Sequence, residues 1–259
     1  MYNQFFYNHY LIRSVVFFGF FWFLFFLSLL LFLTTASGSK GRDYIRERVD
    51  GLVTLKEDLA DFPNLTSETN SQDALKTMTY VLGGTQNSLR LKFRTTADLY
   101  FKGMSGKILI ASLPGITEYA EDVGRNLSNE EWKIRQLNHM GIEQDKIEFI
   151  NLQDGFFGTM REAKTLKTIS IERGIDRLVL VCSAYHSKRV WLTFSEMLKS
   201  SGVEIQVYTA DEKIMLRGLL VEYAKLIFYE NLLIPFQVWL QNKEQNADDV
   251  VLCPNSNPF

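Results

Sequence analysis

Residues 177–194, RLVLVCSAYHSKRVWLTF, begin as a buried strand and continue directly into a helix. After Arg177 the strand part is an uncharged run of Leu, Val and Cys, which is typical of a strand covered on both faces. Similar short runs occur at residues 76–84, 107–112, 146–152 and 204–210, and helical patterns separate them. This alternation predicts an α/β fold, a Rossmann-like parallel five-stranded sheet with helices on both faces.

The predicted helices between and after these strands lie at residues 88–103, 129–141, 158–174, 187–202 and 214–234. The last of them is strongly apolar, but Arg217, Glu222, Lys225 and Glu230 interrupt it. Because charged groups are costly at bilayer depth, we expect this helix to pack on the core, and a contact with the membrane surface stays open. Residues 113–128 read as a long polar loop.

An uncharged run at residues 15–33, VVFFGFFWFLFFLSLLLFL, precedes the α/β pattern. A run of about 18 or more apolar residues can cross a bilayer as a helix, so the sequence predicts one transmembrane helix at residues 14–36 after a flank at 1–13. A cleaved signal peptide is the alternative, since small residues follow the run, but its apolar core is usually only about 7–15 residues long.

The rest of the chain divides into a juxtamembrane helix and linker (37–75), the α/β domain (76–236) and a polar tail (237–259). The net charge of −2 gives no indication of a basic nucleic-acid surface. The two cysteines exclude a disulfide-stapled scaffold and a cysteine-rich zinc site, and no metal site is predicted. We expect Cys182 to pack in the core as a free thiol.

Ligands of open parallel sheets bind at the carboxyl ends of the strands, which makes the polar residues at those ends the candidate site. These residues are Gly83, Gly84, Ser112, Thr159, Glu162, Ser183, Tyr185, His186 and Arg189. Arg189 follows His186 by one helical turn, so both can face one ligand. Imidazole can act as an acid or base near neutral pH, and a guanidinium group can grip a phosphate in a bidentate fork.

Several of these residues also have structural interpretations. A strand-ending glycine pair is most often a tight turn, although Gly83 and Gly84 would also allow close approach of a phosphate. Thr159 and Glu162 have the spacing of a helix capping box. His186 could cap the next helix. Arg90, Lys92 and Arg94 have the pattern of a solvated helix face.

The segments YVLGG, ADLYFKG, ILIAS, GFFGTMREA, LVLVCSAYHSKRV and MLRGLLVEYA occur in an order that resembles the YdcF/SanA/ElyC-like envelope protein family, a domain of unknown function. The likeness is greatest to the single-span SanA type and covers about residues 76–236. It implies a ligand pocket at the strand ends and a role in envelope barrier function. The family's arginine on the first helix aligns with Lys92, and its glutamate after the second strand aligns near Asn129, one position before Glu130.

The resemblance and the flanking charges disagree on sidedness. Lys40, Arg42, Arg46 and Arg48 follow the apolar run, whereas only Arg13 precedes it, and this asymmetry favours a cytoplasmic domain. SanA-like proteins place the domain outside the cytoplasm. Following the resemblance, we predict a single-pass protein of the plasma (inner) membrane with an extracytoplasmic domain.

The leading functional hypothesis is the binding of a phosphate-bearing lipid-linked or cell-wall intermediate. Gly83, Gly84 and Arg189 would hold the phosphate, and His186 and Glu162 would be the catalytic residues. The further expected ligand-binding residues are Arg94, Ser112, Thr159, Ser183, Tyr185 and Glu222. The alternatives are a non-enzymatic scaffold that recruits envelope-synthesis proteins, and a cytoplasmic-facing binder of S-adenosylmethionine or a nucleotide. The sequence identifies no cofactor.

Overall fold

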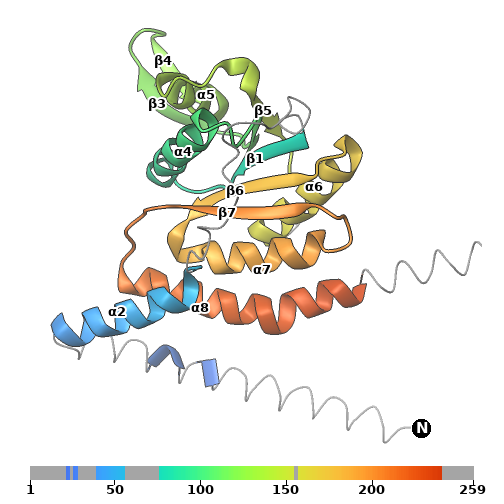
Figure 1. Cartoon of the computed structure of the whole chain (residues 1–259). Coiled ribbons are helices and arrows are strands. Elements are labelled where there is room, and N and C mark those ends of the chain that lie inside the picture. Colours follow the sequence, from blue (N-terminus) through green and yellow to red (C-terminus); the bar gives the residue numbers. More distant parts are fainter. Residues whose placement is uncertain (1–21, 24–25, 29–38, 56–75, 155–156, 241–259) are drawn as a thin grey trace, which may run out of the picture.

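The computed structural model describes residues 22–23, 26–28, 39–55, 76–154 and 157–240. Its centre is a parallel sheet of five strands in the order β5-β2-β1-β6-β7 (Figure 1). The strands are β1 (Thr77–Val81), β2 (Lys107–Ala111), β5 (Ile147–Ile150), β6 (Arg177–Ser183) and β7 (Glu204–Ala210). The predicted α/β fold with a five-stranded parallel sheet is therefore confirmed.

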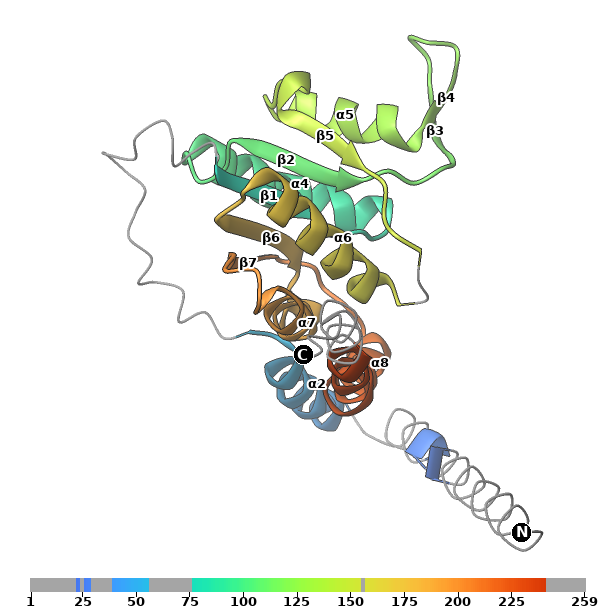
Figure 2. The same ribbon diagram turned by 90° about the vertical axis from the view of Figure 1, so that its right-hand side faces the viewer.

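Helices cover both faces of this sheet (Figure 2). The helix α4 (Gln86–Phe101) and the helix α5 (Asn129–His139) pack on one face, and α6 (Gly158–Arg173) and α7 (Ser187–Leu198) pack on the other. The strands alternate between the two cores: Ile108 and Ile110 of β2 contact the α4–α5 side, and Leu109 contacts the α6–α7 side. This alternation with both sides apolar explains why the strands appear as continuous hydrophobic runs in the sequence.

Two helices form a further layer below α7 (Figure 1). They are α2 (Ser39–Val53) and α8 (Leu216–Phe228), and α8 continues through a π-helical turn, Tyr229–Leu233, into helix up to residue 240. Val49 and Val53 of α2 pack with Leu219 of α8 in one buried cluster. The helix expected next to the membrane is thus docked on the domain.

The structure differs from the sequence prediction in residues 113–128. There, β3 (Ile116–Ala120) and β4 (Arg125–Ser128) form an antiparallel hairpin where we expected a loop. The hairpin buries little apolar surface, and Ile116 is 74% exposed. Without a buried face the strands carry no clear alternation of apolar and polar residues, which is the signal that identifies a strand.

The predicted transmembrane helix at residues 14–36 lies mostly outside the described residues. Residues 22–23 and 26–28 of it are helical. Within the ranges that the structure describes, no helix has both the length and the apolar character needed to cross a bilayer. Residues 56–75, which contain the predicted linker, and residues 241–259 of the predicted tail (237–259) also lie outside the described residues, whereas residues 237–240 of that tail are helical.

Candidate functional site

The sheet reverses its strand order between β1 and β6. From β1 the chain proceeds to β2 and β5 on one side, and β6 and β7 lie on the other side. Ligands of doubly wound sheets bind at such a switch point, beyond the carboxyl ends of the two strands. Val81 pairs with Val181, and the N–H of Leu82 donates to the carbonyl of Val181 at 3.0 Å. The glycines after β1 therefore lie beside Ser183, as the sequence predicts.

Glu162 of α6 closes the turn after β1. One of its carboxylate oxygens accepts hydrogen bonds from the Gly83 N–H at 3.1 Å and the Tyr80 hydroxyl at 3.0 Å. The first helical residue is Gly158 and the N-cap is Phe157, so the capping-box interpretation of Glu162 is wrong. Burial raises the pKa of the Glu162 carboxyl, and the two hydrogen bonds oppose this effect. Because Gly83 donates to Glu162, its N–H is already engaged by a carboxylate.

Lys92 supplies the buried cation of the switch point. Its side chain is 0% exposed, and its ammonium donates to the carbonyls of Leu82 at 3.2 Å and Gly83 at 2.7 Å. Burial lowers the pKa of Lys92, and nearby acidic groups oppose this shift. Arg94 is exposed, because residues two positions apart point to different sides of a helix. The structure therefore places Lys92, and not the predicted Arg94, at the switch point.

Two serines share a carboxylate next to this lysine. Both Ser88 and Ser183 donate to the same oxygen of Glu212, with Ser88 at 2.7 Å, and the two hydroxyl oxygens lie 3.1 Å apart. A Cβ atom on Gly84 would lie 3.0 Å from the Lys92 Nζ and from the Ser88 Oγ, so a larger residue would require these side chains to shift. The sequence prediction missed Ser88 and Glu212. Glu212 lies in the connection after β7, and no local pattern distinguishes it.

A second polar group joins α6, α7 and α8. Arg189 donates to one oxygen of Glu222 from Nε at 3.3 Å and from Nη2 at 3.0 Å, and its Nη1 donates to the Thr159 hydroxyl. Lys225 donates to the other oxygen of Glu222 at 2.7 Å. The Arg189 guanidinium also lies over the ring of Tyr229, 5.1 Å from its centroid. Thr159, Arg189 and Glu222 were predicted for the site, and the structure brings them together.

His186 is within electrostatic range of both polar groups. It occupies the N-cap position of α7, but its side chain makes no capping hydrogen bond within the described residues. Burial lowers its pKa well below the ordinary value, and the charges of Lys92, Arg189 and Lys225 lower it further. The imidazole is therefore neutral at neutral pH and offers one donor and one acceptor. Its ring packs edge-on against Tyr185 at 5.1 Å, and burial raises the pKa of Tyr185.

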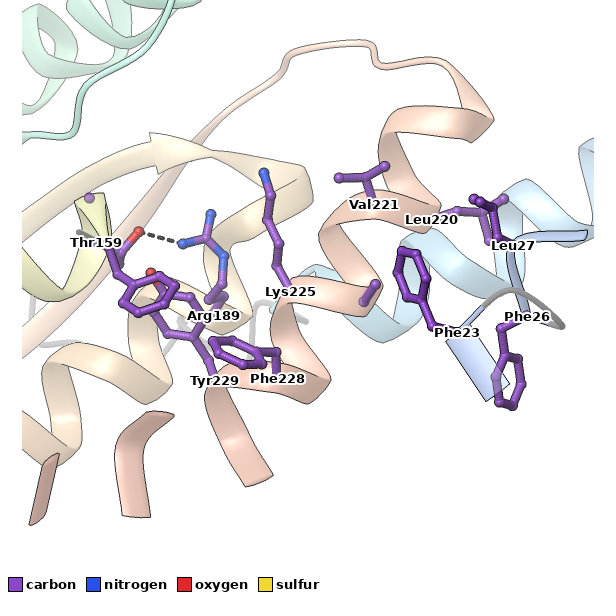
Figure 3. A pocket seen from close by; sticks show the side chains of 13 residues that line it. Phe23, Phe26, Leu27, Thr159, Arg189, Leu220, Val221, Lys225, Phe228 and Tyr229 are labelled. Atoms are coloured by element: carbon purple, nitrogen blue, oxygen red, sulfur yellow. Dashed lines mark hydrogen bonds between the residues drawn. The ribbon is translucent and has the colours of Figure 1, made fainter. Parts of the chain in front are cut away.

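A pocket of about 790 Å³ lies beside Thr159, Arg189, Glu222 and Lys225, here called the Arg189 group. Figure 3 shows Thr159, Arg189 and Lys225 gathered at one part of it. The remaining walls are largely apolar and come from α8, from the start of α6 and from the described N-terminal residues. They are Phe23, Phe26, Leu27, Phe157, Gly158, Leu220, Val221, Ala224, Phe228 and Tyr229. A mainly apolar pocket with a few convergent polar groups is the usual form of a small-molecule site.

Ser112 follows β2, one strand away from the switch point. Its hydroxyl donates to Glu130 of α5, and nearby the Lys133 ammonium donates to the carbonyl of Ala111 at 2.8 Å. Asn129, where the family's glutamate aligns, instead donates to the carbonyl of Pro114 at 2.9 Å. Glu130 is thus the acid that meets the end of β2, one position beyond the aligned one.

The described part of the chain contains no group of three or more His, Cys, Asp or Glu residues arranged to hold a metal ion. No protein-family model matches the chain, and neither does any curated protein. The resemblance to the YdcF/SanA/ElyC-like family therefore stays a prediction from its motifs.

Proposed function

We propose that this chain is a membrane-anchored envelope protein, similar to the SanA and ElyC types, that binds a phosphate-bearing lipid-linked intermediate in the pocket beside Arg189. The observation that carries the proposal is a pocket that is apolar along most of its walls and cationic at one end. An anionic amphiphile has the same division, with an acyl or prenyl chain and a phosphate. The uncharged run at residues 15–33 supports the anchor.

The charge of the Arg189 group favours an anionic ligand. Two cations, Arg189 and Lys225, share the single carboxylate of Glu222, which leaves an excess of one positive charge. Lys225 is 50% exposed and uses one of its three N–H donors on Glu222, so two can turn towards a ligand. Hydrogen bonds between a cation and a phosphate are about twice as strong as those between neutral groups.

The apolar walls would hold the chain of the amphiphile. Burial of apolar surface contributes about 0.8 kcal/mol for each methylene group, so six methylenes in the pocket would contribute about 5 kcal/mol. A free phosphate lacks this contribution, and a long-chain alcohol lacks the contribution of the cations. The two halves of the pocket together select a molecule that has both.

The geometry supports an amphiphile better than a nucleotide. In nucleotide-binding sheets the N–H groups of the first strand–helix turn face the phosphates. In this chain the Gly83 N–H donates to Glu162, and the Glu212 carboxylate lies on the serines beside the turn. Carboxylates in these positions would repel a pyrophosphate. We therefore assign the phosphate to Arg189 and Lys225, which both line the pocket.

The test compares the binding of dodecyl phosphate, dodecanol and inorganic phosphate to the full chain in a maltoside detergent held at constant concentration. We expect dodecyl phosphate to bind, inorganic phosphate not to bind measurably, and dodecanol to bind at least about tenfold more weakly, which is about 1.4 kcal/mol. Lys225→Met should remove most of the preference for the phosphate. Lys199→Met is the matched control, because Lys199 is an exposed lysine at the C-cap of α7, with its Nζ 3.9 Å from the Glu196 carboxylate. Equal binding of dodecyl phosphate and dodecanol would overturn the proposal.

A further inference from the structure

The outer side of α8 and of the helix that follows carries a row of exposed apolar side chains. Its members are Val221, Phe228, Leu232, Phe236 and Trp239, here called the apolar stripe. They follow one another at intervals of three, four or seven residues, the spacing of one helix face. Leu232, Phe236 and Trp239 are 61%, 53% and 56% exposed, and the rings of Phe236 and Trp239 stack at 6.0 Å.

The other side of the same helix is apolar as well. Leu219, Leu226, Tyr229 and Leu233 are buried against the domain. A surface helix of a soluble domain normally has one apolar and one polar side, whereas a helix that is apolar on both sides is covered on both. The domain covers one side of α8. On the outer side, Val221, Phe228, Leu232 and Phe236 remain exposed.

The N-terminal residues of the chain indicate what covers the stripe. Phe23 and Leu27 belong to the uncharged run at residues 15–33, and they line the pocket together with Leu220 and Val221 at the beginning of α8 (Figure 3). Described residues of a segment with the length and composition of a membrane anchor therefore lie beside one end of the apolar stripe. The other end carries Trp239, and tryptophan is enriched at the interface of membranes.

We infer that the apolar stripe rests on the surface of the lipid bilayer as a second membrane contact beside the anchor. The inference rests on the proposed function, because it requires the anchored chain. An apolar helix face in this position inserts about 5–10 Å into the boundary between headgroups and acyl chains. Lys225 flanks the stripe, and a lysine can keep its ammonium group at the polar interface while its stem lies on apolar surface.

This placement determines how a ligand reaches the pocket. Val221 and Phe228 belong both to the pocket wall and to the apolar stripe. An amphiphile can then enter sideways from the leaflet, with its chain still among lipid chains and its phosphate turned towards Arg189 and Lys225. The bilayer contact thus defines the substrate class further, as a lipid that the protein takes from the membrane it is anchored in.

The contact can be measured by the quenching of Trp239 emission by lipids with brominated acyl chains. The full chain with Trp22→Phe and Trp191→Phe is placed in phosphatidylcholine–phosphatidylglycerol vesicles, which leaves Trp239 and the fully buried Trp132. A control chain also has Trp239→Phe and carries its reporter at Phe101→Trp, an exposed position on α4 across the sheet. We expect the brominated lipids to remove most of the Trp239 emission and to leave the control reporter unchanged.

Substitutions then test whether the stripe itself makes the contact. Leu232→Glu with Phe236→Glu should abolish most of the Trp239 quenching, whereas Ile171→Glu on α6, which is also exposed, should leave it unchanged. The double variant should still bind dodecyl phosphate in detergent, because neither residue lines the pocket.

Two results would overturn the inference. One is equal quenching of the two reporters. The other is that Leu232→Cys forms disulfide-linked dimers while brominated lipids leave Trp239 emission unchanged, because a second copy of the chain would then cover the stripe. Quenching of Trp239 without any binding of dodecyl phosphate would reject the ligand of the proposed function and retain the anchored chain and its membrane contact.

Discussion

Removal of the Glu222 carboxylate is the sharpest test of the site's architecture. Glu222 is 9% exposed at its side chain and Arg189 is 10% exposed, and three charged hydrogen bonds converge on the carboxylate. Removing one partner of a buried ion pair costs about 3–5 kcal/mol, because the other charge is left without compensation. For a domain of about 150–250 residues, each kcal/mol lowers the melting temperature by about 2–4 °C. We therefore expect Glu222→Ala to lower the melting temperature by about 10 °C.

Thermal unfolding of the full chain in detergent, followed by tryptophan emission, measures this change. Glu196→Ala is the matched control, since Glu196 is 36% exposed and lies 3.9 Å from Lys199. Exposed pairs of this kind contribute only about 0–1 kcal/mol. The double substitution Glu222→Leu with Arg189→Leu should recover much of the loss, because it leaves no unpaired charge at this pair. A Glu222→Ala variant as stable as the control would refute the reasoning about the buried group.

Three further predictions concern the switch point and the core. Gly84→Ala should lower the free energy of unfolding by about 1–3 kcal/mol, because its methyl group would lie 3.0 Å from two polar side-chain atoms. The control Gly51→Ala, whose Cβ meets nothing within 4 Å, should stabilise α2 by up to about 1 kcal/mol, and denaturant titration measures both changes. The pKa of His186 is lowered in the folded chain, so the unfolded chain binds a proton at this residue more readily, and the stability that His186 contributes is present above about pH 6.5 and lost as the pH falls. When unfolding is measured at stepwise lower pH, the free energy of unfolding should decrease less in His186→Gln than in the unsubstituted chain; an equal decrease would contradict the direction of this effect. Burial raises the pKa of the Cys182 thiol to about 12, so this thiol should not react in the folded chain at pH 8. With Cys253→Ser, which leaves Cys182 as the single thiol, mass spectrometry should detect modification by iodoacetamide only after denaturation.

The two polar groups have different physical characters. The switch-point group around Lys92 is buried and internally bonded, with Glu162 and Glu212 in contact with the donors that a ligand would otherwise use. The Arg189 group keeps a half-exposed lysine at an apolar pocket. We infer that the first group fixes the geometry of the strand ends and the second meets the ligand. Charges from both groups lower the pKa of His186.

Much of the secondary structure was determined by the sequence alone. The three inner strands, β2, β1 and β6, are buried on both faces after their first residues, so each had to be a short uncharged run, and such a run is visible without any tertiary information. Two of the predicted helices, 88–103 and 129–141, end at glycines: Gly103 and Gly141 have φ of +73° and +84°, a conformation that other residues rarely adopt. The cluster at residues 183–189 was found for a similar reason, because strand ends in a parallel sheet share one edge.

Only the tertiary structure decided which of the polar residues meet. Lys92 and Arg94 have equivalent chemistry in the sequence, and the sheet that α4 covers buries one and leaves the other in solvent. Glu162 matched a local capping pattern, yet it bonds to Gly83, which is 79 residues away. The pocket draws on α6, α7, α8 and Phe23, and Glu212 comes from a connection without a local signal. Periodicity reports how one element is buried, whereas bonds between elements depend on their relative placement, which packing of the whole chain sets.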